Sequence, residues 1–64
     1  MKKTEKRKVA EQLRIYRAAK RLNQSQFALL CGLTQRTVSL IENEEFERVS
    51  LDTINKVEDY VAHH

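Results

Sequence analysis

The sequence predicts an all-α domain that consists of four helices, or of five if a further short helix forms. Apolar residues recur at spacings of three and four along most of the chain, which is typical of amphipathic helices. No stretch of useful length alternates with a period of two, so no sheet is expected. The chain has one glycine, Gly32, and no proline. At 64 residues it forms one domain at most.

The amino-terminal segment, residues 1–8, is predicted to be either a basic arm or an extension of the first helix, and residues 9–64 are predicted to form the folded domain. Residues at helical spacing define the apolar face of the first helix: Val9, Leu13, Tyr16, and Ala19 or Lys20. Arg14, Arg17 and Arg21 distribute positive charge around its remaining surface.

Residues 22–43 predict two short helices that are joined by a tight corner. Asn23 is suited to cap a helix that begins at Gln24, and Gln26 completes a reciprocal capping box. Gly32 is the position at which a left-handed backbone costs least, so the chain is predicted to turn there. Thr34 then caps a helix that begins at Gln35.

These two helices each have an apolar and a polar face. The residues predicted to share a core are Phe27, Ala28, Cys31, Val38 and Ile41. The exposed face of the second of the two helices carries Gln35, Arg36, Ser39 and Leu40. Long hydrogen-bonding side chains stand at its amino end, which is the end that contacts base edges when such a helix enters DNA.

The carboxyl-terminal third is predicted to contain a loop and one more helix. Residues 44–49 show no clear period, and Phe46 is the only large apolar residue among them. Ser50 is suited to cap the last helix, with Asp52 in its first turn. The buried face of that helix is predicted to contain Leu51, Ile54, Val57 or Glu58, and Val61.

Charge is distributed very unevenly along the chain. Residues 1–21 contain nine Lys or Arg and two Glu, whereas residues 44–64 contain two basic and six acidic residues. A basic end favours a polyanionic partner, because each neutralised phosphate releases counterions. Such a run can also be no more than a solvated surface.

Several classes of protein are not supported by the residues. Cys31 is most simply a small buried side chain in a protein of a reducing compartment. His63 and His64 lie at the end of the chain, and no nucleophile with a base, no metal-ligand cluster and no phosphate loop is evident. We therefore expect no enzyme activity, no cofactor and no metal. Without an apolar run long enough to span a membrane, the expected location is cytoplasmic.

From Leu13 onward the chain resembles the Xre/Cro family of helix-turn-helix regulators, which includes the phage lambda and 434 repressors. The resemblance rests on residues at fixed spacing: Leu13-Arg14, Tyr16-Arg17, Lys20, Leu22-Asn23-Gln24, Phe27-Ala28, Gly32, Thr34-Gln35, Val38 and Ile41-Glu42-Asn43. It implies a lambda-repressor-like domain whose second and third helices form the helix-turn-helix.

The resemblance also implies roles for individual residues. The residues expected to contact bases are Gln35, Arg36, Ser39 and Leu40. Gln24 is expected to bind a phosphate and to brace Gln35. Other phosphate contacts are expected from Asn23, Arg14, Lys3, Lys6, Arg7 and Arg48. Arg17 and Glu42 are expected to form a structural salt bridge between the first and third helices.

The chain departs from the family pattern in three respects. Arg21 and Glu44 stand where the family often has glycine, and Asn43 is an alternative residue for a left-handed backbone after the third helix. Glu44, Glu45 and Glu47 would repel a phosphate, so either this loop faces away from DNA or binding depends on the basic amino end. The family's fifth helix is missing, which should leave apolar surface on the fourth helix uncovered.

The function expected from these observations is sequence-specific binding of double-stranded DNA by a homodimer, with repression as the outcome. One alternative is an antitoxin that also binds a toxin. Another is a protein-interaction module that no longer binds DNA and uses Leu29, Leu30 and Phe46 as an apolar contact surface.

Overall fold

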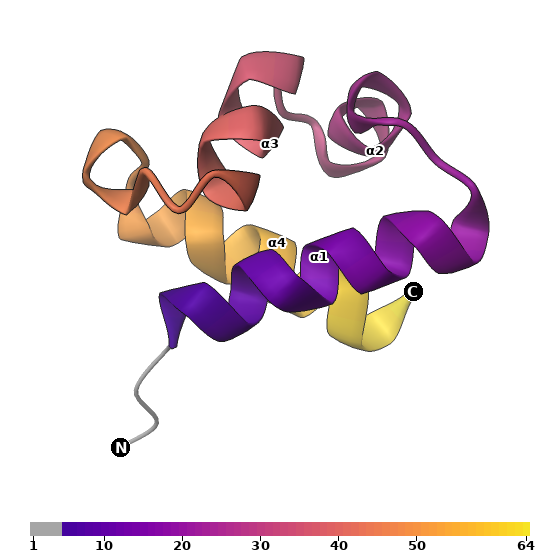
Figure 1. Cartoon of the computed structure of the whole chain (residues 1–64), viewed down its shortest axis with the longest axis horizontal. Coiled ribbons are helices and arrows are strands. Elements are labelled where there is room, and N and C mark those ends of the chain that lie inside the picture. Colours follow the sequence, from indigo (N-terminus) through magenta and orange to yellow (C-terminus); the bar gives the residue numbers. More distant parts are fainter. Residues whose placement is uncertain (1–4) are drawn as a thin grey trace.

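The computed structural model describes residues 5–64, and α-helices occupy most of this part of the chain (Figure 1). The helices are α1 (Lys6–Lys20), α2 (Gln24–Cys31), α3 (Gln35–Glu42) and α4 (Leu51–His63), with a single 3₁₀ turn, η1 (Phe46–Arg48), between α3 and α4. Within residues 5–64 there is no strand, so the predicted all-α class with four helices is confirmed. Figure 1 shows α2 and α3 on one side of the layer formed by α1 and α4.

Helix α1 begins earlier than the apolar pattern predicted. Lys6, Arg7 and Lys8 belong to its first turn, so they extend the helix and are not part of an arm. Lysine and arginine are good helix formers, and the Val9 amide already donates to the Glu5 carbonyl at 3.1 Å. The remainder of the proposed arm, residues 1–4, lies outside the described residues.

The predicted corner between α2 and α3 is confirmed. The Gln26 amide donates to Asn23 Oδ1 at 2.8 Å, and the Asn23 amide donates to Gln26 Oε1 at 2.9 Å, which completes the capping box. Gly32 takes the left-handed conformation with φ 71°. Thr34 Oγ1 accepts the Thr37 amide at 3.2 Å and so starts α3.

The turn after α3 was predicted at the wrong residue. Asn43 keeps φ at −86°, and its amide still donates to the Ser39 carbonyl at 2.9 Å, as in a continuing helix. The left-handed residue is Glu44, with φ 60°. Because the chain reverses one residue later, the Glu45 amide reaches back to the Leu40 carbonyl at 2.9 Å. This turn places the acidic loop beside the end of α3.

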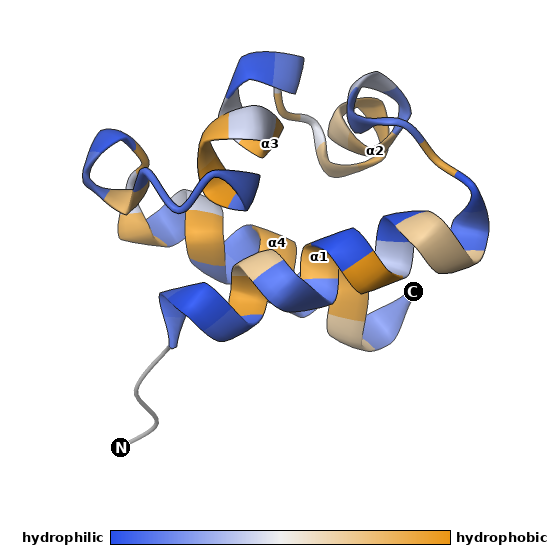
Figure 2. Cartoon of the chain, viewed as in Figure 1, coloured by the Kyte–Doolittle hydropathy of each residue, from blue (hydrophilic) through white to orange (hydrophobic). Residues whose placement is uncertain are grey.

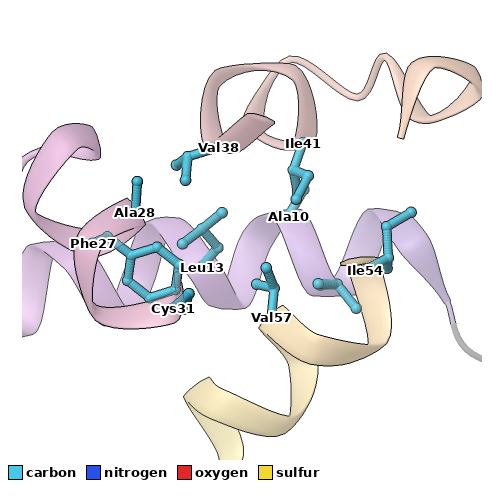
Figure 3. Close-up of a cluster of buried hydrophobic side chains, with 10 residues drawn as sticks. Ala10, Leu13, Phe27, Ala28, Cys31, Val38, Ile41, Ile54 and Val57 are labelled. Carbon is cyan, nitrogen blue, oxygen red and sulfur yellow. The ribbon is translucent and has the colours of Figure 1, made fainter. Parts of the chain in front are cut away.

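All four helices contribute to one hydrophobic core (Figure 3). Its buried residues are Val9, Ala10, Leu13, Phe27, Ala28, Cys31, Val38, Ile41, Ile54 and Val57. The predicted core residues of α2 and α3 are confirmed. Of the two alternatives predicted on α4, Val57 is buried and Glu58 is not. Figure 2 shows hydrophobic and hydrophilic segments alternating along α1, α3 and α4, and the buried apolar residues of these helices belong to this core.

Three predictions of apolar contacts are wrong. Leu51 is 54% exposed, because it occupies the first position of α4, beyond the edge of the core. Ala19 and Lys20 are exposed in the last turn of α1, although Ala19 lines a groove between α1 and α4. Phe46 packs against the core instead of contributing to an exposed patch, since η1 folds back onto the domain.

An aromatic cluster joins α1, α2 and α4. The rings of Tyr16, Phe27 and Tyr60 contact one another edge to face, with centroid distances of 5.7 to 5.9 Å. Such edge-to-face pairs contribute beyond the area they bury. The cluster therefore holds the carboxyl-terminal half of α4 against the domain.

Cys31 is part of the core, as expected for a small buried side chain. Burial raises the pKa of its thiol, and the charge of Lys56 only partly opposes this effect. A thiol that stays protonated is a poor nucleophile.

Candidate nucleic-acid interface

The exposed face of α3 forms one wall of a hollow on the protein surface. Gln35 and Arg36 are exposed at the amino end of the helix, while Ser39 and Leu40 are half-buried one turn later. The hollow is lined by Gln24, Gln35, Arg36, Ser39, Leu40, Glu45 and Arg48. The structure thus brings the four predicted base-contacting residues together with two of the predicted phosphate contacts.

Gln24 reaches this hollow from the first turn of α2. Its Nε2 donates to Glu42 Oε1 at 3.0 Å, so the hydrogen bond of its amide goes to Glu42 rather than to Gln35. A side-chain amide nitrogen carries two hydrogens, and one of them remains available to a ligand. Glu42 therefore fixes the position of an amide that still has a donor for a phosphate.

Glu42 also holds α1 against α3 through Arg17. Arg17 Nε donates to Glu42 Oε2 at 2.6 Å, and Nη2 donates to Oε1 at 2.9 Å. Only 21% of the Arg17 side chain and 8% of the Glu42 side chain are exposed. Arg17 Nη1 additionally donates to the Leu22 carbonyl at 2.9 Å. The expected salt bridge is therefore present, in the bidentate geometry that makes such pairs strong.

The protonation of Glu42 follows from these contacts. Burial alone would raise the pKa of this carboxyl, but hydrogen bonds from Arg17 and Gln24 and the charges of Arg17 and Arg14 outweigh it. The pKa of Glu42 is therefore lowered, and that of Arg17 is raised by the same hydrogen bond. The pair stays ionised at neutral pH and keeps α1, α2 and α3 in a fixed arrangement.

Arg14, which was expected to contact a DNA phosphate, makes a hydrogen bond within the protein. Its Nη1 donates to the main-chain carbonyl of Glu42 at 2.8 Å. This carbonyl belongs to the last turn of α3, where acceptors lack partners within the helix. Arg14 is exposed, and it thus stabilises the end of α3 from the side of α1.

The first two carboxylates of the acidic loop point to different surfaces. Glu44 Oε1 lies 3.4 Å from Arg7 Nε, in a second hollow that is lined by Arg7, Lys8, Glu11, Arg14 and Glu44. Glu45 Oε1 lies 3.9 Å from Arg48 Nη1, in the hollow of α3. The loop therefore contributes one carboxylate, that of Glu45, to the hollow of α3 and another, that of Glu44, to the second hollow.

The remaining predicted phosphate contacts are more dispersed. Lys6 is exposed in the first turn of α1, and Asn23 is exposed while its Oδ1 caps α2. Arg7 and Arg14 line the second hollow and not that of α3. Lys3 lies outside the described residues.

Reasoning from the sequence did not identify Glu45 as a residue of the exposed surface of α3. Its place depends on the left-handed backbone of Glu44 and on the hydrogen bond from the Glu45 amide to Leu40. The loop has glutamate at positions 44, 45 and 47. Nothing in the local sequence indicates which of these three side chains lies beside α3.

Residues 5–64 have neither a membrane-spanning helix nor a cluster of metal ligands. No helix in this range is long and apolar enough to cross a lipid bilayer. The same residues contain no group of three or more His, Cys, Asp or Glu side chains placed to hold a metal ion.

Comparison with known proteins gives one positive result. No curated protein and no solved structure matches the chain. The sequence model of the Cro/C1-type HTH DNA-binding domain matches residues 12–61, a span that contains α2, the corner at Gly32, α3 and most of α1 and α4. Because this match covers more than half of the chain and its helix-turn-helix is present in the structure, the protein belongs to the family of Cro/C1-type HTH DNA-binding domains.

Proposed function

We propose that this protein is a sequence-specific transcriptional repressor that binds double-stranded DNA by inserting α3 into the major groove. The observation that carries the proposal is the shared hollow in which Gln35 and Arg36, both exposed, stand beside Gln24. A helix-turn-helix meets base edges with the amino-terminal residues of its second helix. Occupation of a promoter would then exclude the transcription machinery.

The four residues on the exposed face of α3 have the chemistry needed to read bases. The amide of Gln35 can pair with N6 and N7 of adenine, and the guanidinium of Arg36 can pair with O6 and N7 of guanine. Ser39 offers a hydroxyl to either kind of base, and Leu40 offers an apolar contact to a thymine methyl group.

Phosphate contacts would position α3 in the groove. Gln24 lies in the first turn of α2, where main-chain amides and the helix dipole favour an anion. Its amide is held by Glu42, so little side-chain freedom is lost on binding. Arg48 lines the same hollow. The proposed set of phosphate contacts also includes Asn23, Arg14, Lys3, Lys6 and Arg7.

The contribution of the basic amino end can be measured from the salt dependence of DNA binding. Replacing both Lys3 and Lys6 with glutamine should reduce the slope of log affinity against log salt concentration by about 2, since each phosphate contact contributes about 0.9. A matched double variant, Lys20→Gln with Lys56→Gln, removes the same charge outside the proposed contacts. Fluorescence anisotropy would measure both slopes; equal slopes in the two variants would remove Lys3 and Lys6 from the interface.

We further propose that the protein binds DNA as a homodimer. Ile15, Leu29, Leu30 and Leu51 are large apolar side chains that are more than half exposed. Covering such residues by a second protomer would remove apolar surface from water. A two-fold related pair of α3 helices would read two half-sites about one helical turn apart.

Stoichiometry tests the dimer. Analytical ultracentrifugation on a symmetric duplex recovered by selection should give two protomers per duplex at saturation, while a duplex with one half-site should bind one protomer more weakly. A single protomer on the symmetric duplex would contradict the dimer.

A second candidate function is a protein-interaction role, such as that of an antitoxin. Leu29 and Leu30 favour it, because these neighbouring residues of α2 are 80% and 51% exposed. Phe46 no longer supports this surface, since it packs against the core. Failure to enrich any DNA sequence would favour this candidate over the repressor.

A further inference from the structure

The carboxyl end of α3 presents an acidic side chain to the surface that the proposed function assigns to DNA. Glu45 is one of the seven residues that line the hollow, together with Ser39 and Leu40. Its amide donates to the Leu40 carbonyl at 2.9 Å, so the main chain holds this residue against the last turn of α3. The side chain is half-buried, and its carboxylate lies 3.9 Å from Arg48 Nη1.

The neighbouring Glu44 shows that this placement is particular to one residue. Glu44 has a left-handed backbone, and its carboxylate lies 3.4 Å from Arg7 on the side of α1. The two adjacent carboxylates therefore line separate hollows. If the acidic loop only faced away from DNA, neither carboxylate would need to lie beside the residues proposed to contact bases. The carboxylate of Glu45 does lie beside them.

From this geometry we propose that Glu45 is a specificity-determining residue that accepts a hydrogen bond from the N4 amino group of a cytosine. This inference rests on the proposed function. An ionised carboxylate only accepts hydrogen bonds, and cytosine N4 is the donor that Glu and Asp recognise in the major groove. Arg48 neutralises part of the charge of Glu45 and thereby reduces its repulsion from the phosphates on either side.

The position of this cytosine within the half-site can be inferred from the position of Glu45, which follows Leu40 and the end of α3. Gln35 and Arg36 occupy the amino end of α3, and Ser39 and Leu40 lie one turn further along. Glu45 extends the same surface past the carboxyl end of the helix. The cytosine should therefore lie at the edge of the half-site, next to the base that Leu40 contacts.

Selection of bound sequences from a random duplex pool tests the proposal when it is run in parallel on wild type, Glu45→Ala and Glu44→Ala. Both variants lose one negative charge in the same loop, and neither side chain belongs to the core. The wild type should enrich a cytosine at one edge position of the half-site. Glu45→Ala should lose the preference at that position alone, with about a tenfold drop in discrimination between the cytosine site and the same site with another base. Glu44→Ala should retain the preference.

Three other results would overturn the inference. If Glu45→Ala kept the wild-type consensus and bound every sequence more tightly, Glu45 would act only through repulsion. If Glu44→Ala lost the same preference, the effect would belong to loop charge and not to the position of Glu45. If the wild type enriched no sequence, the proposed function would fail together with this inference, whereas either of the first two results leaves that function intact.

Discussion

Replacing Arg17 with alanine should lower the free energy of unfolding by about 2 to 3 kcal/mol, because it leaves the carboxylate of Glu42 largely buried without its cation. Glu42 is 8% exposed, so water cannot replace the bidentate contact that Arg17 provides. A domain of this size has a total stability of only about 3 to 10 kcal/mol. The variant should therefore be partly unfolded under mild conditions.

Urea unfolding followed by circular dichroism would measure this loss. Arg14→Ala is the matched control, because Arg14 is exposed and also binds Glu42, although through its main-chain carbonyl. That control should cost less than about 1 kcal/mol. The double variant Arg17→Met with Glu42→Leu should recover much of the stability, since it leaves no buried charge unpaired. Equal losses for Arg17→Ala and Arg14→Ala would contradict the structural role of the pair.

The same pair predicts how the variant responds to pH. The pKa of Glu42 is lowered in the folded protein from its usual value of 4.5, so its contribution to stability is present above that pH and disappears as the pH falls through the folded pKa. The difference in unfolding free energy between wild type and Arg17→Ala should therefore be largest near neutral pH and should shrink below about pH 4.5.

Replacing Gln35 with alanine should weaken binding to the selected site by about 1 to 3 kcal/mol, the usual value of a bidentate contact to a base. Gln35 is exposed and is not part of the core, so the fold should be unaffected. Binding to random duplex should change little, because phosphate contacts dominate nonspecific affinity. The variant should therefore lose specificity rather than general affinity for DNA.

Gln12→Ala provides the control for this experiment. Gln12 is also an exposed glutamine, but it lines a groove between α1 and α4, separate from the hollow of α3. Its replacement should leave both specific and nonspecific binding unchanged. Equal losses on the selected site and on random duplex for Gln35→Ala would argue against a base-reading role.

The parts of the fold that could be predicted from the sequence are those set by local chemistry. Asn23 with Gln26, Gly32 and Thr34 define the corner within a few residues, because caps and left-handed turns depend on neighbouring groups. The periodic apolar residues of α2 and α3 likewise identified their buried faces. The candidate base-contacting residues came together because they share one face of a single short helix.

The parts that could not be predicted depend on contacts between segments. Local preference favours Asn43 over Glu44 for a left-handed backbone. The turn nevertheless falls at Glu44, because the helical hydrogen bonding of α3 continues through Asn43. The exposure of Leu51 reflects where α4 begins relative to the core, which helical spacing does not show. Glu45 reaches the hollow of α3 only because of that turn, so its place required the structure.

The central claim is that α3 reads a DNA sequence through its exposed face, and selection from a random duplex pool by the purified protein tests it most directly. We expect a two-fold symmetric consensus whose preferences weaken at one position when Gln35 is replaced with alanine. Absence of enrichment, or an identical consensus from the Gln35→Ala variant, would contradict the claim.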